Sequence, residues 1–427
     1  MIIGENGRHR DEIYAMWQRN FHDPVPYADF YFAEVYGNND ILLNVTEGEE
    51  DQNLKGSDVP EIKAAEMLNA PENSAQVIRG MLHLNPYTLT VRGRDMKAHY
   101  IVGVATDEQF RRQGVMRELL AETFSRLRRS GESFTYLMPA DENYYLPFDF
   151  RFGIRQLEQE IECFGKAVPP EQERFSFQAG LPEDLEEVCR MENDRREKQF
   201  AVCTRITPDY LRRMEKEVRS DFGRLVTAYR NGVYAGRFVM GAENDCMVLS
   251  QVVYAGTEDR QEFLHEALLY SEREYHYGRY QLILDETWKE ELRAPGNYQG
   301  VRLLPVREKK IIMFRILDLE KTGTDLCSDV EAACRIRVRD DFLKEQDGVY
   351  LWHAEKQGST IRKISADEEP QITDGGSISI AALTELIFGR REDRTEEMYE
   401  GLTAESRALM EGLRPLQPCC KIGRAHV

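Results

Sequence analysis

The chain has 427 residues, which corresponds to roughly three domains at about 150 residues each. It carries 56 Lys and Arg against 75 Asp and Glu, so its formal net charge is −19, and 41% of its residues are hydrophobic. That content of apolar residues excludes a wholly disordered chain. The acidic charge argues against a general nucleic-acid binder, because phosphate would be repelled, and it favours cationic partners.

The sequence contains no charge-free apolar run of the ~20 residues that a membrane span requires. Its first residues lack the apolar region of a signal peptide, so we expect a cytoplasmic protein with no membrane span. The eight cysteines show no C-x-x-C spacing, which favours reduced thiols over a disulfide framework. The histidines show no H-x-x-x-H spacing, so we expect no metal site.

The first domain, predicted over residues 1–165, is expected to open with a helix and then to alternate strands with one long acidic loop. Asn85-Pro86 should interrupt its strands. The elements expected before residue 92 are a helix at Asp11–Asn20, strands at Ile41–Val45, Val77–Leu84 and Tyr87–Val91, and a short helix at Ile62–Leu68 within the loop Glu47–Ser74.

A change of hydrophobic period follows the next strand, expected at Tyr100–Ala105. A helix face is indicated by apolar residues that recur at three- and four-residue spacing, namely Met116, Leu119, Leu120, Phe124 and Leu127. A further strand is expected at Phe134–Met138. This is a β-α-β unit, and its first turn is where a ligand site is most often built.

The second domain, predicted over residues 166–314, repeats that order of elements. Its clearest signal is Asn231-Gly232, a pair that favours a tight hairpin turn. Hairpin, strand, helix and strand then follow as in the first domain, so we predict an internal duplication. The other expected elements are helices at Leu181–Arg196 and Asp259–Tyr275 and strands at Met247–Tyr254 and Gln281–Leu284.

The third domain, predicted over residues 315–427, is expected to be a small α+β unit without a catalytic constellation. Cys334, Ile336 and Val338 alternate with arginines, which indicates a half-buried strand. The other expected elements are strands at Val349–Trp352, Thr360–Ile364 and Ile372 and helices at Ser379–Phe388 and Ala404–Met410.

The turn between the strand ending near Thr106 and the following helix contains Arg111-Arg112-Gln113-Gly114-Val115-Met116. The N–H groups of a first helical turn have no acceptor inside the helix, and with the helix dipole they form an anion site. Gly114 leaves room for a pyrophosphate, and the two arginines add positive charge. An ordinary strand-to-helix turn is the alternative, but the flanking strand and helix make it the weaker one.

This string resembles motif A of the GNAT acetyltransferases, whose R-x-x-G-x-(G/A) loop holds the pyrophosphate of acetyl-CoA. The closer resemblance, over nearly the whole chain, is to the enhanced-intracellular-survival (Eis-like) branch. It implies an α+β fold of tandem GNAT domains, the second degenerate, followed by a small α+β sterol-carrier-protein-like domain. Met116 departs from the Gly or Ala of the wider motif.

The resemblance also assigns residues by position. Val104, Ala105 and Thr106 would pair with the pantetheine arm, and Tyr145 would be the general acid, with Tyr144 as the adjacent rival. A tyrosine suits that role because it stays protonated near neutral pH; without the resemblance, a core aromatic would be the better interpretation. The residues expected to cradle the phosphates are Arg112, Gln113, Gly114, Val115, Met116 and Arg117, with Ala140 and Asp141 as further contacts.

The equivalent turn of the second copy lacks the R-x-x-G spacing. Glu258 and Asp259 stand where phosphate would bind and would repel it. We therefore expect acetyl-CoA in the first domain only, with the second domain walling the acceptor pocket.

In this branch the catalytic base is the carboxylate at the end of the chain, which here would be that of Val427. The chain ends with a polar Gly-Arg-Ala-His run, and Ile422–Val427 match one reading frame of a sequencing adapter, so we expect the natural chain to end near Lys421 and this polypeptide to be impaired. If the ending is native, Val427 supplies the base. Otherwise His83, His99 or solvent would serve.

The sequence thus predicts an N-acetyltransferase that uses acetyl-CoA as co-substrate and moves acetyl to a primary amine: an amino-sugar, a polyamine or a Lys side chain. A cationic small molecule or a Lys-containing peptide is the expected partner, and the resemblance implies a homo-oligomer, up to a hexamer. Asp23, Asp29 and Glu34, within Phe21–Tyr36, form a candidate cation pocket, although a solvated helix explains them better. The alternative function is a non-catalytic acyl-CoA or lipid-binding protein.

Overall fold

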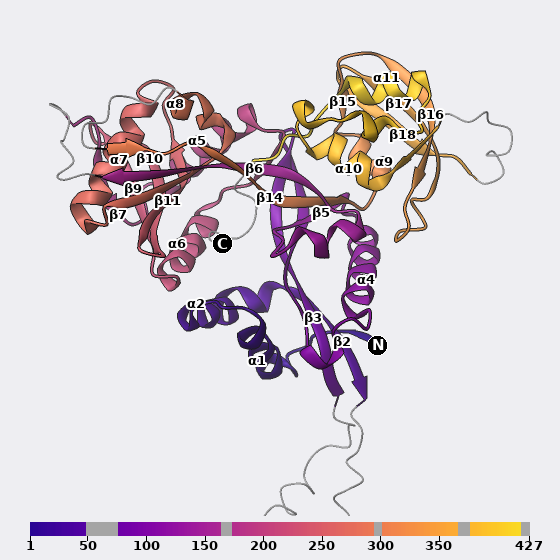
Figure 1. Ribbon diagram of the computed structural model, residues 1–427, viewed down its shortest axis with the longest axis horizontal. Coiled ribbons are helices and arrows are strands. Elements are labelled where there is room, and N and C mark those ends of the chain that lie inside the picture. Colours follow the sequence, from indigo (N-terminus) through magenta and orange to yellow (C-terminus); the bar gives the residue numbers. More distant parts are fainter. Residues whose placement is uncertain (48–75, 164–172, 294–300, 366–375, 420–427) are drawn as a thin grey trace, which may run out of the picture.

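The computed structural model describes residues 1–47, 76–163, 173–293, 301–365 and 376–419. The short helix predicted at Ile62–Leu68, the strand at Ile372 and the candidate base Val427 lie outside these residues. The described chain forms three lobes, with the first below and the second and third on either side (Figure 1). No helix of this described part is long and apolar enough to cross a membrane.

The first lobe is a twisted sheet with helices on both faces. Leu119 and Phe124 of the long helix pack against Leu42, Leu82 and Ile101 on one face, while the two N-terminal helices cover the other. The strands run antiparallel from β1 to β4, and β4 pairs parallel with β5. The elements are β1 Ile2–Gly4, α1 Arg10–Asn20, α2 Val25–Phe30, β2 Asp40–Glu47, β3 Gln76–Val91, β4 Arg94–Thr106, α4 Val115–Arg129 and β5 Phe134–Leu137.

The predicted break at Asn85-Pro86 is wrong, because β3 runs through it without interruption. Pro86 pairs opposite His99 of β4. On its other edge β3 pairs with β2 only as far as Leu84 and with β8 (Val202–Thr204) only from Leu89. The proline therefore lies where that edge has no strand partner, which is the place in a sheet where a missing N–H is tolerated.

The second lobe has the predicted hairpin, strand, helix and strand. Asn231 and Gly232 have φ values of 52° and 79° and form the tight turn expected of them. A buried ion pair between Glu192 and Arg237, at 2.7 Å, fastens α5 to the sheet. The elements are β7 Ser176–Ala179, α5 Leu185–Gln199, α6 Pro208–Ser220, β9 Arg224–Arg230, β10 Val233–Glu243, β11 Cys246–Tyr254, α7 Arg260–Tyr275, β12 Arg279–Leu284 and α8 Lys289–Arg293.

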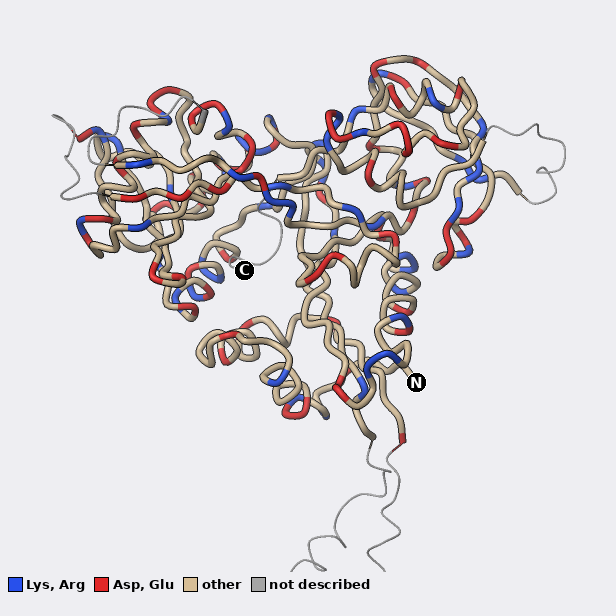
Figure 2. The backbone as a smooth tube through the Cα atoms, in the orientation of Figure 1, with Lys and Arg blue, Asp and Glu red and all other residues tan. Residues whose placement is uncertain are grey.

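Two long strands join the first two lobes into one sheet. β14 (Arg307–Ile316) lies between β5 and β6 (Arg151–Cys163), and β6 continues to β12 of the second lobe and to β13 (Val301–Leu303). Neither β6 nor β14 is predicted from the sequence. Acidic and basic residues meet along this crossing (Figure 2), where Arg155 pairs with Glu308 at 3.0 Å. The sheet of the first lobe thus includes β14, whose residues follow the second lobe in the sequence.

The third lobe contains the alternating strand predicted around Cys334, with Ile336 and Val338 buried. It is fastened to the first lobe by Arg315, which is fully buried and pairs with Asp340 at 2.7 Å. The elements are α9 Leu319–Gly323, β15 Cys327–Ser328, β16 Ala332–Arg339, β17 Gly348–Glu355, β18 Gly358–Lys363, β19 Ser377–Ser379, α10 Ile380–Phe388, α11 Ala404–Gly412 and β20 Leu413–Arg414.

A β-bulge interrupts the pairing of β3 with β4. The register shifts between Met81 and His83 opposite Val102–Ala105, and Gly103 has a φ of 61°. A Cβ atom on Gly103 would approach Cζ3 of Trp17 to 2.7 Å. Both the backbone angle and the space therefore require glycine here.

We expect Gly103→Ala to lower the free energy of unfolding by about 2–4 kcal/mol, because it adds left-handed strain and a clash with the Trp17 ring. Urea denaturation measures this. Gly232→Ala is the matched control, since Gly232 also has a positive φ but has no heavy atom within 4 Å of the added Cβ. Equal losses in the two variants would show that the Trp17 contact does not matter.

Candidate active site

The parallel strands β4 and β5 separate at one end. They pair only at Tyr100 with Tyr136 and at Ile101 with Leu137, whereas β4 continues along β3 to Thr106. From Val102 onward, the described part of β5 offers β4 no further pairing. Backbone groups along this edge of β4 are therefore available to a ligand that inserts between the strands. Val104, Ala105 and Thr106, predicted to contact pantetheine, lie on this edge.

The loop that leads from β4 into α4 is shaped by two residues with left-handed backbone angles. Arg112 has a φ of 61° and Gly114, the N-cap of α4, a φ of 81°. The first bond inside the helix runs from the N–H of Glu118 to the carbonyl of Gly114. The N–H groups of Val115, Met116 and Arg117 precede it and have no acceptor within the helix.

Open space and positive charge surround this helix terminus. A Cβ atom on Gly114 would have no heavy atom within 4 Å, and Arg112, Gln113 and Arg117 are exposed. Arg111 is held against the lobe, since its Nη2 donates to the side-chain oxygen of Asn20 at 3.2 Å. The residues present therefore fit a pyrophosphate at the N-terminus of α4.

Tyr144 and Tyr145 differ strongly in exposure. Tyr144 is 60% exposed, whereas Tyr145 is 8% exposed and contacts the ring of Phe150 at 5.8 Å. Burial raises the pKa of Tyr145, so its phenol keeps its proton at neutral pH. Ala140 and Asp141 lie exposed on the segment between β5 and Tyr145, and Asp141 accepts a hydrogen bond from the N–H of Asn143.

The two histidines considered as alternative bases are both buried. Nδ1 of His83 is hydrogen-bonded to the Tyr31 hydroxyl, 2.9 Å away, and its Nε2 has no partner within the described residues. Desolvation lowers the pKa of His83 to about 3. His99 is held by Glu132, with Nδ1 and Oε1 2.6 Å apart. The low pKa of His83 and the pairing of His99 with Glu132 therefore argue against either imidazole as the base.

The corresponding turn of the second lobe is closed. Asp259 is the N-cap of α7, and its carboxylate pairs with Arg174 and, at 2.8 Å, with Arg230. The guanidinium of Arg260 lies 3.8 Å over the ring of Trp288. The protein's own negative charge therefore occupies the helix terminus that stays open in the first lobe.

The three carboxylates of the candidate cation pocket already have partners. Asp23 accepts from the indole N–H of Trp17 at 3.0 Å, and Asp29 accepts from the Tyr14 hydroxyl at 2.8 Å. Glu34 forms an ion pair with Lys216 of α6, with Nζ and Oε1 3.0 Å apart. The Glu34–Lys216 pair connects the N-terminal segment with the second lobe, and each of the three carboxylates has a partner.

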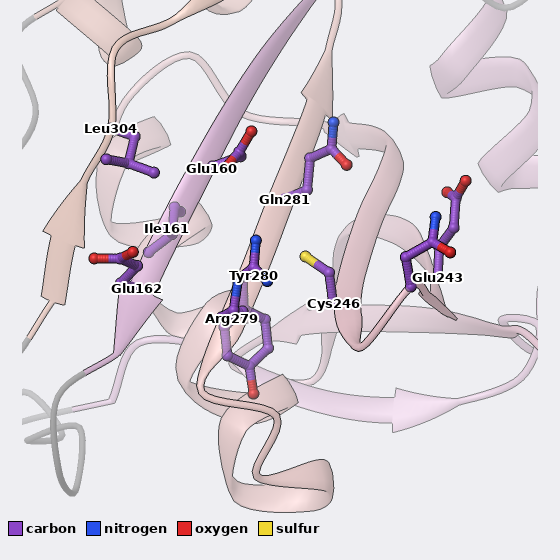
Figure 3. A pocket seen from close by; sticks show the side chains of 10 residues that line it. Glu160, Ile161, Glu162, Glu243, Cys246, Arg279, Tyr280, Gln281 and Leu304 are labelled. Carbon is purple, nitrogen blue, oxygen red and sulfur yellow. The ribbon is translucent and has the colours of Figure 1, made fainter.

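Two hollows lie away from this site. One of about 190 Å³ lies in the second lobe (Figure 3), where Cys246 begins β11 and Arg279 begins β12 beside Glu160 and Glu162 of β6. Another of about 630 Å³ lies against β17 in the third lobe. Neither is lined by a residue that the sequence assigns to the active site. Among the described side chains, no group of three or more potential metal ligands is found.

The bulge at Gly103 was not singled out by sequence reasoning. An isolated glycine within a strand pattern, as in Val102-Gly103-Val104, is a signal for a bulge or for close backbone approach. Here it both bends β4 and brings the strand against Trp17.

Residues 46–153 match the acetyltransferase (GNAT) domain family. This range contains the bulged β4, the open helix terminus and both tyrosines. The protein is therefore an enzyme, with a GNAT acetyltransferase domain in its first lobe. GNAT domains use acetyl-CoA as co-substrate. The match disfavours the alternative of a non-catalytic binding protein.

Solved structures share the fold of the whole chain. A probable N-acyltransferase from Enterococcus faecalis V583 has a TM-score of 0.70 at 14% identity, with 97% of each chain covered. A GCN5-related N-acetyltransferase from Anabaena variabilis ATCC 29413 has a TM-score of 0.68 at 12% identity, covering 99% of this chain and 98% of that one. Eis1 from Mycobacterium abscessus has a TM-score of 0.64 at 14% identity, with 98% of each chain covered. No curated protein matches the sequence.

We expect Gly114→Glu to abolish acetyl-CoA binding measured by calorimetry, because a carboxylate would stand at the helix terminus that must receive phosphate. Gly114→Ala is the control. It introduces the same left-handed backbone strain without charge, so it should retain most of the affinity. Binding by the Glu variant with wild-type affinity would refute this location.

We expect the stability of the protein to fall as the pH is lowered from about 6.5 toward 3. The unfolded chain protonates His83 near pH 6.5, whereas the folded chain keeps it neutral until about pH 3, so acid favours unfolding. At pH 5 the effect is about 2 kcal/mol. His83→Gln should flatten this dependence in urea titrations at several pH values, and His22→Gln, at an exposed position, should not. Identical slopes in all three proteins would contradict the assignment.

Proposed function

We propose that this protein is an acetyl-CoA-dependent N-acetyltransferase that transfers acetyl directly to a primary amine. Two observations together carry the proposal. β4 and β5 separate after Ile101 and Leu137, and the N-terminus of α4, which follows β4, is open and flanked by arginines. The family match of this segment supports it. In the second lobe, Asp259 closes the equivalent terminus, which supports one cofactor site per chain.

Acetyl-CoA supplies the acyl group as a thioester. The N–H groups of Val115–Arg117, with Arg112 and Gln113, would hold the pyrophosphate, and the free edge of β4 at Val104, Ala105 and Thr106 would pair with the pantetheine arm. Ala140 and Asp141 would contact it from the opposite side. A backbone N–H near Val104 would stabilise the negative charge that develops on the carbonyl oxygen.

The neutral amine attacks the acyl carbon, so that an N–C bond forms and the C–S bond breaks. Tyr145 gives its proton to the sulfur as CoA leaves, and the nitrogen loses a proton to a base. The resemblance assigns that base to the terminal carboxylate, here of Val427, which lies outside the described residues. The burial of His83 and the pairing of His99 with Glu132 support a base other than either imidazole.

The proposed acceptor is an amino-sugar, a polyamine or a Lys side chain. We also propose the Eis-like arrangement of a catalytic GNAT domain at 1–165, a degenerate one at 166–314 and a sterol-carrier-protein-like domain at 315–427, in a homo-oligomer. The fold shared with Eis1 over nearly the whole chain supports this arrangement. β14, which joins the sheet of the first lobe, ties these domains together.

We expect Tyr145→Phe to lower kcat by roughly 10²–10⁴ with acetyl-CoA affinity nearly unchanged, because only the transferable proton is lost. Tyr144→Phe is the matched control and should have a much smaller effect, since that ring is 60% exposed. Steady-state kinetics with any accepted amine measures both. Equal losses would show that Tyr145 is not the acid.

A further inference from the structure

A group of buried tyrosines lies at the closed end of the β4–β5 separation, on the face of the sheet opposite α4. Tyr100 and Tyr136 stand across from each other on β4 and β5, with ring centroids 5.4 Å apart. Tyr87 of β3 contacts Tyr100 at 6.4 Å. All three are at most 8% exposed. They belong to the hydrophobic cluster that also contains Phe134 and Phe314.

Helix α6 of the second lobe covers this group with a cation. The guanidinium of Arg213 lies 5.2 Å from the ring centroid of Tyr87 and 5.8 Å from that of Tyr210. Arg213 is half-buried, and within the described part of the chain it forms neither a hydrogen bond nor an ion pair. Glu217, one turn further along α6, interacts with it electrostatically. A half-buried guanidinium with its N–H groups unused is suited to receive an anion.

The hydroxyl of Tyr136 gives an independent indication. Tyr136 is fully buried, and its hydroxyl has no hydrogen-bond partner among the described residues. A buried hydroxyl without a hydrogen-bond partner lowers the stability of the protein, so we expect a ligand atom to accept a hydrogen bond from it. Burial raises the pKa of Tyr136 well above its usual value, which keeps it a donor. Tyr87 contacts both the guanidinium of Arg213 and the ring of Tyr100, and Tyr100 contacts Tyr136, so the two donors belong to one cluster.

The cluster lies beside the reacting groups. The Tyr100–Tyr136 pair is next to the last pair of the two strands, Ile101 with Leu137, after which β4 and β5 separate. Val102 and Met138, both partly exposed, border the cluster on the side where the strands part. The cofactor loop belongs to α4, on the other face. The tyrosines and Arg213 therefore belong to the acceptor's side of the site.

We propose that Arg213 and the hydroxyl of Tyr136 bind a carboxylate of the acceptor, so that the substrate is an amine that also carries a carboxylate: an amino acid or a short peptide. A guanidinium and a phenol hydroxyl both donate to a carboxylate, and the positive guanidinium repels a polyamine. The chain as a whole carries a net charge of −19, so its overall charge does not attract a carboxylate, whereas the guanidinium of Arg213 does. The inference rests on the proposed function and narrows its acceptor class.

Matched pairs of amines that differ only in a carboxylate test this directly: lysine against cadaverine, and ornithine against putrescine. We expect kcat/KM to be at least ~10-fold higher for the amino acid of each pair.

Arg213→Gln should lower kcat/KM for lysine by roughly 10- to 100-fold, mainly through KM, and leave kcat/KM for cadaverine within about 2-fold of the wild-type value. Tyr136→Phe should act in the same direction with a smaller effect, and it keeps the ring that fills the core.

Arg212→Gln is the matched control, because Arg212 is the neighbouring residue on α6, is exposed, and pairs with Asp209 at 2.8 Å. It should change neither the ratio of kcat/KM for lysine to that for cadaverine nor the ratio for ornithine to that for putrescine. All variants should bind acetyl-CoA as the wild type does. Equal use of lysine and cadaverine by the wild type would overturn the inference, as would equal losses for both in Arg213→Gln.

Direct calorimetry separates this inference from the proposed function. If no amine is acetylated, the proposed function fails. A preference of the wild type for binding lysine over cadaverine, lost in Arg213→Gln, would still support the carboxylate site. Absence of that preference would overturn it.

Discussion

The site depends on one constraint, namely that β4 and β5 stop pairing after Ile101 and Leu137. β4 stays paired with β3 as far as Thr106, whereas β5 ends at Leu137. The chain then continues through Pro139, which has no N–H to donate. The bulge at Gly103 bends β4 at the same point. The edge thus exposed lies at the end of β4 from which the chain turns into α4, so backbone donors and the helix terminus are available to one extended ligand.

That separation is held open by a strand from far along the chain. β5 has only four residues, and β4 pairs with two of them, whereas β14 pairs with all four on the other side. β14 follows the second lobe in sequence, and its neighbour β6 continues into the sheet of that lobe. The catalytic lobe therefore cannot complete its sheet from residues 1–165 alone. This explains why the two lobes form a single continuous sheet rather than separate units joined by a linker.

Local signals in the sequence predict the local elements well. The four-residue spacing of Met116, Leu120 and Phe124 predicts α4, and Asn231-Gly232 predicts the hairpin, because periodicity and turn chemistry act within a few residues. β6 and β14 are not predictable in this way, since their pairing partners are distant. Pro86 misleads for the same reason: whether a strand tolerates it depends on where β2 and β8 end. The anion loop at Gly114 is readable from sequence, whereas the placement of Arg213 over Tyr87 depends on how the lobes dock.

The two lobes share one order of elements and differ in chemistry through a few charged side chains. At the helix terminus after the central strand, the first lobe has Gly114 and open space, while the second has Asp259 held by Arg174 and Arg230. A carboxylate in that position excludes a phosphate by charge. From the same lobe, α6 brings the guanidinium of Arg213 to the tyrosines of the first lobe. Under the proposed function, the first copy of the fold binds the cofactor and the second contributes to the acceptor side of the site.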